Sequence, residues 1–451
     1  MSLSSHFSAS LSSSSVAPSA PVVSFEDARH LIEQHAAGVR PGKVETVDLL
    51  AGLGRVLADG ILADRDFPPF ARATRDGYAV RAADLAEVPA QLEVVGEVKA
   101  GDWLEPGACS VGRGQAVGIM TGAPLPAGAD AVVMVEHTSS IHESAGKSVG
   151  KLGDKLVEIR RGVGVGDNFV PRGAEARAGE LLLDRGRRLD HAGIAIAASV
   201  GKSRVEVFRK PRVAVLSTGD EVVEIDATPG PAQIRNSNSC SLAAQVQNAG
   251  GEAVRLAIAP DERGRLRALI EEGLGCDLLL LTGGVSMGKY DLVEQVLGEL
   301  KAEFYFTGAD IQPGRPVVFG SCGDGSSTRS GRVGDPPPHK KYFFGLPGNP
   351  VSTMVTFELF ARPMIEALAG MTPQRLIFLR APLKSEIRTK TGLKRFLPAV
   401  LSGEFENAEV ELARWQGSGD IAALARANCY VVIPPDRERI EAGEFVSLLM
   451  R

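Results

Sequence analysis

The chain is poor in cysteine and lacks the short spacings that cysteine chemistry requires. Its 451 residues include five cysteines, and no two of them have the C-x-x-C spacing of a zinc ribbon or a thioredoxin-like redox motif. An odd number of scattered cysteines is typical of a protein in the reducing cytoplasm. We therefore expect a cytoplasmic protein whose cysteines are packing or surface residues rather than nucleophiles.

Long apolar runs are also missing. Nowhere do 18 apolar residues follow one another, so the sequence predicts no membrane-spanning helix. The formal net charge of −5 argues against a nucleic-acid or anionic-membrane surface. Residues 1–21 are rich in Ser, Ala and Pro and lack the basic start and apolar core of a secretory signal, so we expect a disordered tail.

Three common catalytic motifs are absent. Gly201-Lys202-Ser203 resembles the end of a phosphate-binding P-loop, but Ile196 stands where that loop needs a glycine. Gly146-Lys147-Ser148 fails in the same way at Ile141. The seven histidines include no H-E-x-x-H zinc pattern, and no G-x-S-x-G nucleophile elbow is present.

The pattern of apolar, polar and turn-forming residues changes along the chain. Residues 24–38 have helical periodicity, and Ser24 can cap that helix. Residues 44–206 alternate short apolar runs with Gly and Pro turns, which is typical of a β-rich region, and a more helical stretch at 191–201 closes this region. Residues 375–451 return to short alternating strands and predict a small terminal β domain.

The region from Lys210 alternates strands and helices. We predict strands at 212–218, 252–259, 277–282, 317–320 and 341–346, and helices at 237–249, 262–273, 290–300 and 350–368. Asn236 can cap the first of these helices. Near-continuous apolar strands favour a parallel sheet covered on both faces. Residues 321–340 have the composition of an exposed insertion between two strands.

Polar residues follow four of the predicted strands, where an open parallel sheet binds ligands. These segments are Ser217–Glu221, Pro260–Glu262, Thr282–Ser286 and Leu346–Pro350. Gly283 and Gly284 allow a phosphate to approach the backbone, and Asn349 with Pro350 can begin a helix whose free N–H groups bind an anion. The carboxylates of Glu221, Asp261 and Asp291 could hold Mg²⁺. The alternatives are an ordinary glycine turn and solvated strand-end acids.

Six segments together are similar to those of the molybdopterin molybdenumtransferases (MoeA) and the gephyrin E domain. They are FPPFARATRDGYAV (67–80), IMTGAPLPAGADAVVMVE (119–136), STGDE, TGGVSMGKYD, QPGRP and GLPGNPVS, in family order. QGSGDIAALARANC (416–429) resembles the C-terminal signature. The resemblance covers residues 22–451 apart from the 321–340 insertion.

The resemblance implies a multi-domain α/β plus β protein. The expected parts are a linker domain (22–45 and 165–205), an inserted β-rich domain (46–164), a molybdopterin-binding α/β domain (206–370) and a C-terminal β barrel (371–451). It also implies a homodimer, with the cleft between the α/β domain of one subunit and the inserted domain of the other. Molybdopterin adenylyltransferase and molybdoenzyme-maturation proteins are candidate partners.

The implied reaction inserts molybdate into adenylated molybdopterin and releases AMP, with Mg²⁺ as cofactor. The resemblance gives catalytic positions to Asp76, Thr121, Glu175, Glu221, Asp261 and Asp291, the last three as metal ligands. Substrate contacts are expected at Ser217, Thr218, Gly219, Gly283, Gly284, Ser286, Pro313, Arg315, Pro347, Gly348, Asn349 and Ser352.

Three residues depart from the family pattern. Arg75 stands where methionine is usual, Glu175 where aspartate is usual, and Gln312 where lysine is common. Two alternative functions stay open on the same fold: a scaffold or binding protein, and a divergent enzyme acting on another pterin or nucleotide. The set of acids favours the enzyme, because a scaffold could lose Asp76 or Asp291.

Overall fold

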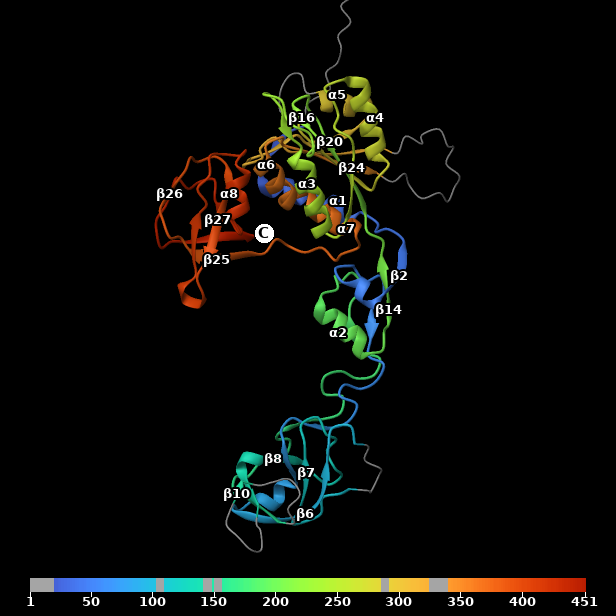
Figure 1. Ribbon diagram of the computed structural model, residues 1–451, viewed down its shortest axis with the longest axis vertical. Coiled ribbons are helices and arrows are strands. Elements are labelled where there is room, and N and C mark those ends of the chain that lie inside the picture. Colours follow the sequence, from blue (N-terminus) through green and yellow to red (C-terminus); the bar gives the residue numbers. More distant parts are fainter. Residues whose placement is uncertain (1–19, 103–108, 141–147, 150–155, 285–291, 324–339) are drawn as a thin grey trace, which may run out of the picture.

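The computed structural model describes residues 20–102, 109–140, 148–149, 156–284, 292–323 and 340–451. The molecule is elongated, with the α/β domain and the C-terminal β domain at one end and the inserted β domain at the other (Figure 1). A narrow linker joins the two ends. No helix in the described ranges is long and apolar enough to cross a membrane.

The α/β domain is built on a six-stranded mixed sheet. Its strands, in spatial order, are β18 (Glu252–Arg255), β15 (Arg212–Ser217), β19 (Leu278–Thr282), β24 (Lys341–Leu346), β23 (Val318–Cys322) and β20 (Glu303–Phe306). The first four run parallel, whereas β23 is antiparallel to both of its neighbours.

The predicted parallel sheet is present in four of the six strands, but one edge of the sheet is antiparallel. Parallel neighbours need a crossover connection, usually a helix. The structure shows no helix in the described residues between β20 and β24, so these three strands fold as an antiparallel edge. The insertion predicted at 321–340 joins β23 to β24, and its residues 324–339 lie outside the described ranges.

Helices cover both faces of this sheet, as the continuous apolar strands predicted. One face packs against α4 (Arg263–Leu274) and α5 (Leu292–Glu299). The other packs against α3 (Ser237–Asn248), α6 (Pro350–Thr356), a π-helical turn (Phe357–Ala361) and α7 (Arg362–Leu368). Along β15, Val213 and Val215 face one core while Ala214 and Leu216 face the other.

The first helix lies with the α/β domain rather than with the linker. Helix α1 (Phe25–Ala37) is capped by Ser24 as predicted. Its residues Ala28, Ile32 and Ala36 are spaced by four, and this buried stripe joins the core that contains α7. The assignment of residues 22–45 to the linker domain is corrected for this helix.

The linker pairs two separate stretches of chain. Strand β2 (Val44–Asp48) pairs with β14 (Arg204–Phe208), and β3 (Ile61–Leu62) pairs with β13 (Leu181–Leu183), beside α2 (His191–Ser199) and a 3-10 turn (Leu49–Gly52). The predicted start of the inserted domain at residue 46 is therefore too early. Leu57 and Ile61 pack with Leu183 and Val207 in one small core, which places them in the linker.

The inserted domain contains a seven-stranded sheet. Its strands, in spatial order, are β10 (Ser148–Val149), β9 (Thr138–Ser140), β11 (Leu156–Ile159), β6 (Ala90–Val98), β7 (Gln115–Ile119), β5 (Gly77–Val80) and β8 (Ala131–Met134). A short pair, β4 (Arg72–Ala73) with β12 (Phe169–Val170), lies where the chain enters and leaves, together with 3-10 turns at Ala82–Leu85 and Val135–His137. This domain therefore extends past its predicted end at residue 164.

The C-terminal domain is a sheet curled around its own core. Strands β27 (Lys394–Ser402), β29 (Cys429–Ile433), β31 (Phe445–Met450) and β25 (Phe378–Pro382) are neighbours, and β28 (Glu409–Leu412) pairs with β27. Leu383 bridges to Val410, which brings the two sides together. The remaining elements are β26 (Ile387–Arg388), β30 (Arg439–Ile440), a 3-10 turn (Phe405–Asn407) and α8 (Ile421–Arg426).

Five further two-residue strands form pairs, and one of these pairs joins two domains. Strand β22 (Ile311–Gln312) leaves the α/β domain to pair with β27, so that domain and the C-terminal domain share a sheet. Strand β1 (Val22–Val23) pairs with β21 (Gly308–Ala309), and β16 (Val222–Val223) pairs with β17 (Ile234–Arg235). The pairing of β16 with β17 brings the start of α3 to the carboxyl end of β15, where the predicted site lies.

Candidate functional site

A pocket lies at the carboxyl ends of β15 and β19, where the sequence predicted a ligand site. Its empty volume, which includes space open to solvent, is about 380 Å³. Of the predicted residues, its lining includes Ser217, Thr218, Glu221, Gly283 and Gly348. The backbone N–H of Thr218 donates to the carbonyl oxygen of Thr282 at 3.0 Å, which fixes the two strand ends together.

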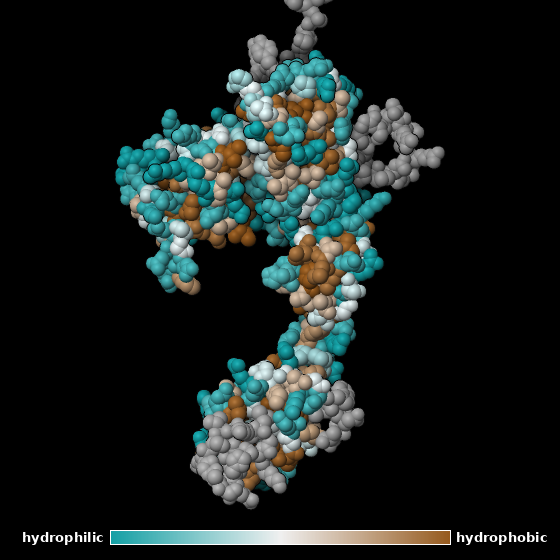
Figure 2. Space-filling view, viewed as in Figure 1, coloured by the Kyte–Doolittle hydropathy of each residue, from teal (hydrophilic) through white to brown (hydrophobic). Residues whose placement is uncertain are grey.

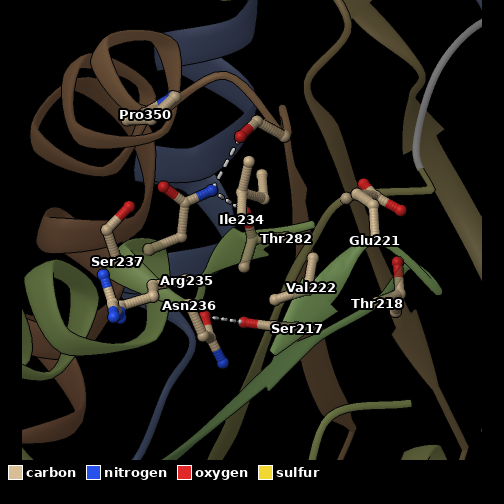
Figure 3. A pocket seen from close by; sticks show the side chains of 13 residues that line it. Ser217, Thr218, Glu221, Val222, Ile234, Arg235, Asn236, Ser237, Thr282 and Pro350 are labelled. Carbon is tan, nitrogen blue, oxygen red and sulfur yellow. Dashed lines mark hydrogen bonds between the residues drawn. The ribbon is translucent and has the colours of Figure 1, made fainter. Parts of the chain in front are cut away.

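The end of β17 and the start of α3 supply four lining residues that the sequence did not select as site residues. They are Arg235, Asn236, Ser237 and Asn238, with Val222, Ile234, Thr282 and Pro350 completing the wall. In Figure 3, Glu221 and Thr218 lie on one side of Val222, and Arg235, Asn236 and Ser237 lie on the other. The available signal was the run Asn236-Ser237-Asn238, which has more polar groups than a helix cap needs.

Two asparagines organise this turn. The buried Asn236 caps α3 as predicted, because its Oδ1 accepts from the N–H of Ser239 at 3.1 Å, and it also accepts from the Ser217 hydroxyl at 2.9 Å. Asn238 donates from Nδ2 to the hydroxyl of Thr282 at 3.0 Å and to the carbonyl oxygen of Gly348 at 2.8 Å. Together they hold the ends of β15 and β19 and the loop before α6 around one pocket.

The glycine turn after β19 is closely packed against Thr218. Gly283 and Gly284 have φ of +89° and +60°, and a Cβ on Gly283 would lie 2.6 Å from the carbonyl oxygen of Thr218. Glycine is therefore required here, as the sequence indicated. Within the described ranges, the buried Thr218 Oγ1 and Asn238 Oδ1 have no hydrogen-bond partner, an arrangement that a polar ligand would satisfy.

Three acids gather beside the pocket. Asp220 accepts from the backbone N–H of Asp261 at 3.0 Å, and a Cβ on Gly219 would come within 2.5 Å of the Glu221 carboxylate, which therefore lies over Gly219. Burial, followed by the charges of Asp220 and Glu221, raises the pKa of Asp261 above its ordinary value.

These oxygen donors suit Mg²⁺ chemically, because a bound cation would relieve the repulsion among them. The described residues nevertheless contain no group of three or more acidic, His or Cys side chains that could hold a metal by themselves. Asp291 and Ser286, which the sequence also selected, lie outside the described ranges.

The remaining predicted rim residues lie beside the pocket rather than in its lining. Asn349 occupies the N-cap position of α6 but makes no capping hydrogen bond within the described chain, which corrects that prediction. Instead the Pro347 carbonyl oxygen accepts from the hydroxyls of Thr282 and Thr353, and these bonds hold the turn. The buried Ser352 faces the core side of α6.

The Pro313-Gly314-Arg315 loop packs against α6. A Cβ on Gly314 would lie 2.3 Å from Cγ2 of Thr356, and Arg315 forms an ion pair with Asp310 at 3.3 Å. The sequence missed Arg395 on β27, which pairs in register with Gln312. Its guanidinium is buried, burial lowers its pKa, and its Nε has no partner among the described residues. A cation therefore stands beside this loop at a buried position.

The inserted domain carries a separate predicted pair. Asp76 accepts from the backbone N–H of Thr121 at 2.7 Å and from its hydroxyl at 2.8 Å, and these bonds lower the pKa of Asp76. Glu175, the third residue expected with them, forms an ion pair with Arg72 at 2.8 Å. Within one chain Asp76 and Thr121 belong to the lobe opposite the pocket (Figure 1, Figure 2), so a single chain does not bring the two groups together.

Comparisons with known proteins agree with this architecture. Family models match in order: "MoeA N-terminal region (domain I and II)" over 23–201, "Probable molybdopterin binding domain" over 214–367, and "MoeA C-terminal region (domain IV)" over 380–450. The Bacillus subtilis molybdopterin molybdenumtransferase is 32% identical, covering 91% of this chain and 90% of the relative. The Nostoc enzyme of the same name is 33% identical, covering 90% and 88%.

Solved structures are similar as well. One crystal structure of a molybdopterin biosynthesis moeA protein from Pyrococcus horikoshii OT3 has a TM-score of 0.70 at 26% identity, covering 95% of this chain and all of that one. Another from Pyrococcus has a TM-score of 0.65 at 32% identity, covering 95% and 99%. The overall fold is thus shared over most of the chain, and the chain belongs to the molybdopterin molybdenumtransferase (MoeA) family.

Proposed function

We propose that this protein is a cytoplasmic molybdopterin molybdenumtransferase that inserts molybdate into adenylated molybdopterin and releases AMP. The observation that carries the proposal is the pocket at the ends of β15 and β19, with unpartnered polar atoms on Thr218 and Asn238 and acids at its edge. The names of the relatives support the same activity. In this reaction water cleaves the phosphoanhydride bond between AMP and the molybdopterin phosphate, and the two dithiolene sulfurs replace two oxygens of molybdate, which leave as hydroxide with the thiol protons.

The rim supplies the groups that such a substrate needs. The glycine turn at 283–284 exposes backbone next to Thr218, and the first turn of α3 offers its N-terminal N–H groups to a phosphate. Glu221 and Asp261, with Asp291, would hold Mg²⁺, which when bound neutralises phosphate charge and favours departure of AMP. Arg315 and the buried Arg395 are the cations we assign to the molybdate anion.

We also propose that the active protein is a homodimer. Asp76 and Thr121 lie in the lobe opposite the pocket, so they can take part in catalysis only if a second subunit places them there. Light scattering of the purified protein should give twice the monomer mass. A stable monomer with full activity would refute the shared cleft. Molybdopterin adenylyltransferase, as supplier of the substrate, and molybdoenzyme-maturation proteins, as receivers of the product, are the proposed partners.

The decisive experiment follows AMP. Purified protein is incubated with adenylated molybdopterin, molybdate and Mg²⁺, and AMP is measured over time, with molybdate omitted in the control. We expect AMP release that depends on both molybdate and Mg²⁺. Tight binding of the adenylated substrate with no release of AMP would contradict the enzyme and favour a scaffold or binding protein on this fold.

A further inference from the structure

A second hollow adjoins the pocket, on the side toward the C-terminal domain. Its empty volume, which includes space open to solvent, is about 440 Å³. The two hollows share Ser237 and Pro350, the first residues of α3 and α6. Because α3 contacts α6 and α6 contacts α8, the second hollow lies where these three helices meet, between the two domains (Figure 1).

The walls of the two hollows differ in chemistry. The first is lined by hydroxyls, carboxamides, Glu221 and Arg235, with Val222, Ile234 and Pro350 among them. The second has Met354 of α6 and Ile421, Leu424 and Ala425 of α8 on its apolar side, where Ile421 is 40% exposed and Leu424 is buried. A ligand that spans both hollows must therefore be polar at one end and flat or apolar at the other.

Two polar residues at the edge of the second hollow restrict the chemistry of its ligand further. Arg451 lines it and donates from Nη1 to the carbonyl oxygens of Leu424 and Ala427, so its guanidinium is held at the end of α8. Ser241 lines it from α3, and its hydroxyl donates to the carbonyl oxygen of Asn238 at 3.0 Å, which leaves its oxygen free to accept. A fixed guanidinium favours the face of an aromatic ring, and an acceptor favours an amino group.

We infer that the second hollow binds the amino-substituted fused heteroaromatic ring of a phosphorylated ligand whose phosphate lies at the first. This inference rests on the proposed function, whose substrate contains two such rings, adenine and a pterin. Both present flat faces for Met354 and Leu424 and an amino group for Ser241. The C-terminal domain thus contributes to substrate recognition through α8, in addition to completing the fold.

The test fills the hollow without touching the first pocket. Ala425 and Ala422 are both exposed on α8, but only Ala425 lines the hollow, so Ala425→Trp and Ala422→Trp form a matched pair. Calorimetric titrations use three probes: AMP, neopterin monophosphate and ribose 5-phosphate, which carries the phosphate and no ring. We expect Ala425→Trp to weaken the binding of at least one ring-bearing probe about tenfold or more, because the ring can no longer be buried in the hollow. Ribose 5-phosphate and all Ala422→Trp titrations should match wild type.

The two ring-bearing probes identify the ring. If only the binding of AMP weakens, the ring in the second hollow is adenine. If only the binding of neopterin monophosphate weakens, the ring is the pterin. Either result supports the inference. It is overturned if neither probe weakens, if ribose 5-phosphate weakens equally, or if wild type binds neither ring more tightly than ribose 5-phosphate. Should Ala425→Trp lower the melting temperature, Ala425→Leu repeats the test with a smaller side chain.

AMP release separates this inference from the proposed function. Absence of AMP release, together with ring-selective weakening in Ala425→Trp, would refute the transferase while the ring site stands. Normal AMP release with no ring-selective weakening would refute the ring site alone.

Discussion

Asn238 donates from its Nδ2 to the hydroxyl of Thr282 across 3.0 Å, which ties the first turn of α3 to the end of β19. A second bond from the same nitrogen to the Gly348 carbonyl oxygen, at 2.8 Å, settles the orientation of the carboxamide, because a carbonyl can only accept. The Oδ1 atom is buried and has no partner in the described part of the chain. One side chain thus holds two loops of the pocket and keeps an unused acceptor beside it.

Replacing Asn238 with leucine should therefore damage the site more than the fold. We expect AMP release to fall about tenfold or more and the free energy of unfolding to fall by about 1–3 kcal/mol, because two hydrogen bonds worth about 0.5–1.5 kcal/mol each are lost. Steady-state AMP release and urea denaturation measure the two effects. Asn248→Leu, on the exposed end of the same helix, is the control and should leave both unchanged. Equal activity of the two variants would show that Asn238 has no part in the site.

The glycine turn gives a second prediction. At Gly284 φ is +60°, and a Cβ would lie 2.9 Å from Thr218 Oγ1, so Gly284→Ala should push that hydroxyl away from the pocket. We expect weaker AMP binding in a calorimetric titration and a loss of about 1–2 kcal/mol in stability from the left-handed conformation.

A matched glycine tests the specificity of this effect. Gly298 lies near the end of α5, and a Cβ there would meet nothing within 4 Å. Gly298→Ala should bind AMP like wild type and be as stable or slightly more stable, because alanine favours the helix. If Gly284→Ala also binds AMP normally, the turn does not contact the phosphate.

The sequence predicted features that depend on residues nearby in the chain and missed those that depend on distant ones. Caps at Ser24 and Asn236 were predictable because they depend on residues three positions away. The parallel strands were predictable because both of their faces are buried, which leaves an apolar run. The antiparallel edge at β23 was not, since its direction depends on the missing crossover helix rather than on its own residues.

The site was predicted in outline for a similar reason. Strand ends can be located from local pattern, and parallel strands place them at one edge. The contribution of Asn238 was missed because its partners, Thr282 and Gly348, lie 44 and 110 residues away in sequence. Arg395 was missed because β22 leaves its own domain to pair with β27, which no local pattern indicates.

Replacing an acid at the rim should have opposite effects on stability and on activity. Because its burial and the nearby charges of Asp220 and Glu221 raise the pKa of Asp261 in the fold, its ionised form destabilises the metal-free protein. That destabilisation is present above the raised folded pKa and disappears as pH falls toward the ordinary value of 3.8. Asp261→Asn should therefore raise the melting temperature at pH 7 without Mg²⁺, yet require much more Mg²⁺ for AMP release.

Thermal melts and Mg²⁺ titrations of AMP release test this pair of effects. Asp436→Asn, at an exposed turn of the C-terminal domain, should leave both curves unchanged. Overlapping Mg²⁺ curves for Asp261→Asn and wild type would show that Asp261 is only a solvated strand-end acid. The corresponding sequence-based prediction for Asp291→Asn, in a residue outside the described ranges, is the same increase in Mg²⁺ requirement with normal folding.

The bond between Thr121 and Asp76 gives the last prediction. The backbone N–H of Thr121 lowers the pKa of Asp76 first and its hydroxyl second, so Thr121→Val removes only the second cause and keeps the shape of the side chain. A carboxylate whose pKa is depressed in the fold stabilises the folded state at pH values above its unfolded pKa. This stabilisation is lost as the pH falls through the folded pKa. In Thr121→Val the folded pKa of Asp76 should rise part of the way to 3.8, so this stabilisation should be smaller and should be lost at higher pH.

Carboxyl chemical shifts in a pH titration measure the pKa directly, and acid unfolding should begin at higher pH than in wild type. Thr46→Val, on an exposed strand of the linker, should change neither. If the Asp76 titration is the same in Thr121→Val and wild type, the hydroxyl bond does not hold the carboxylate in solution.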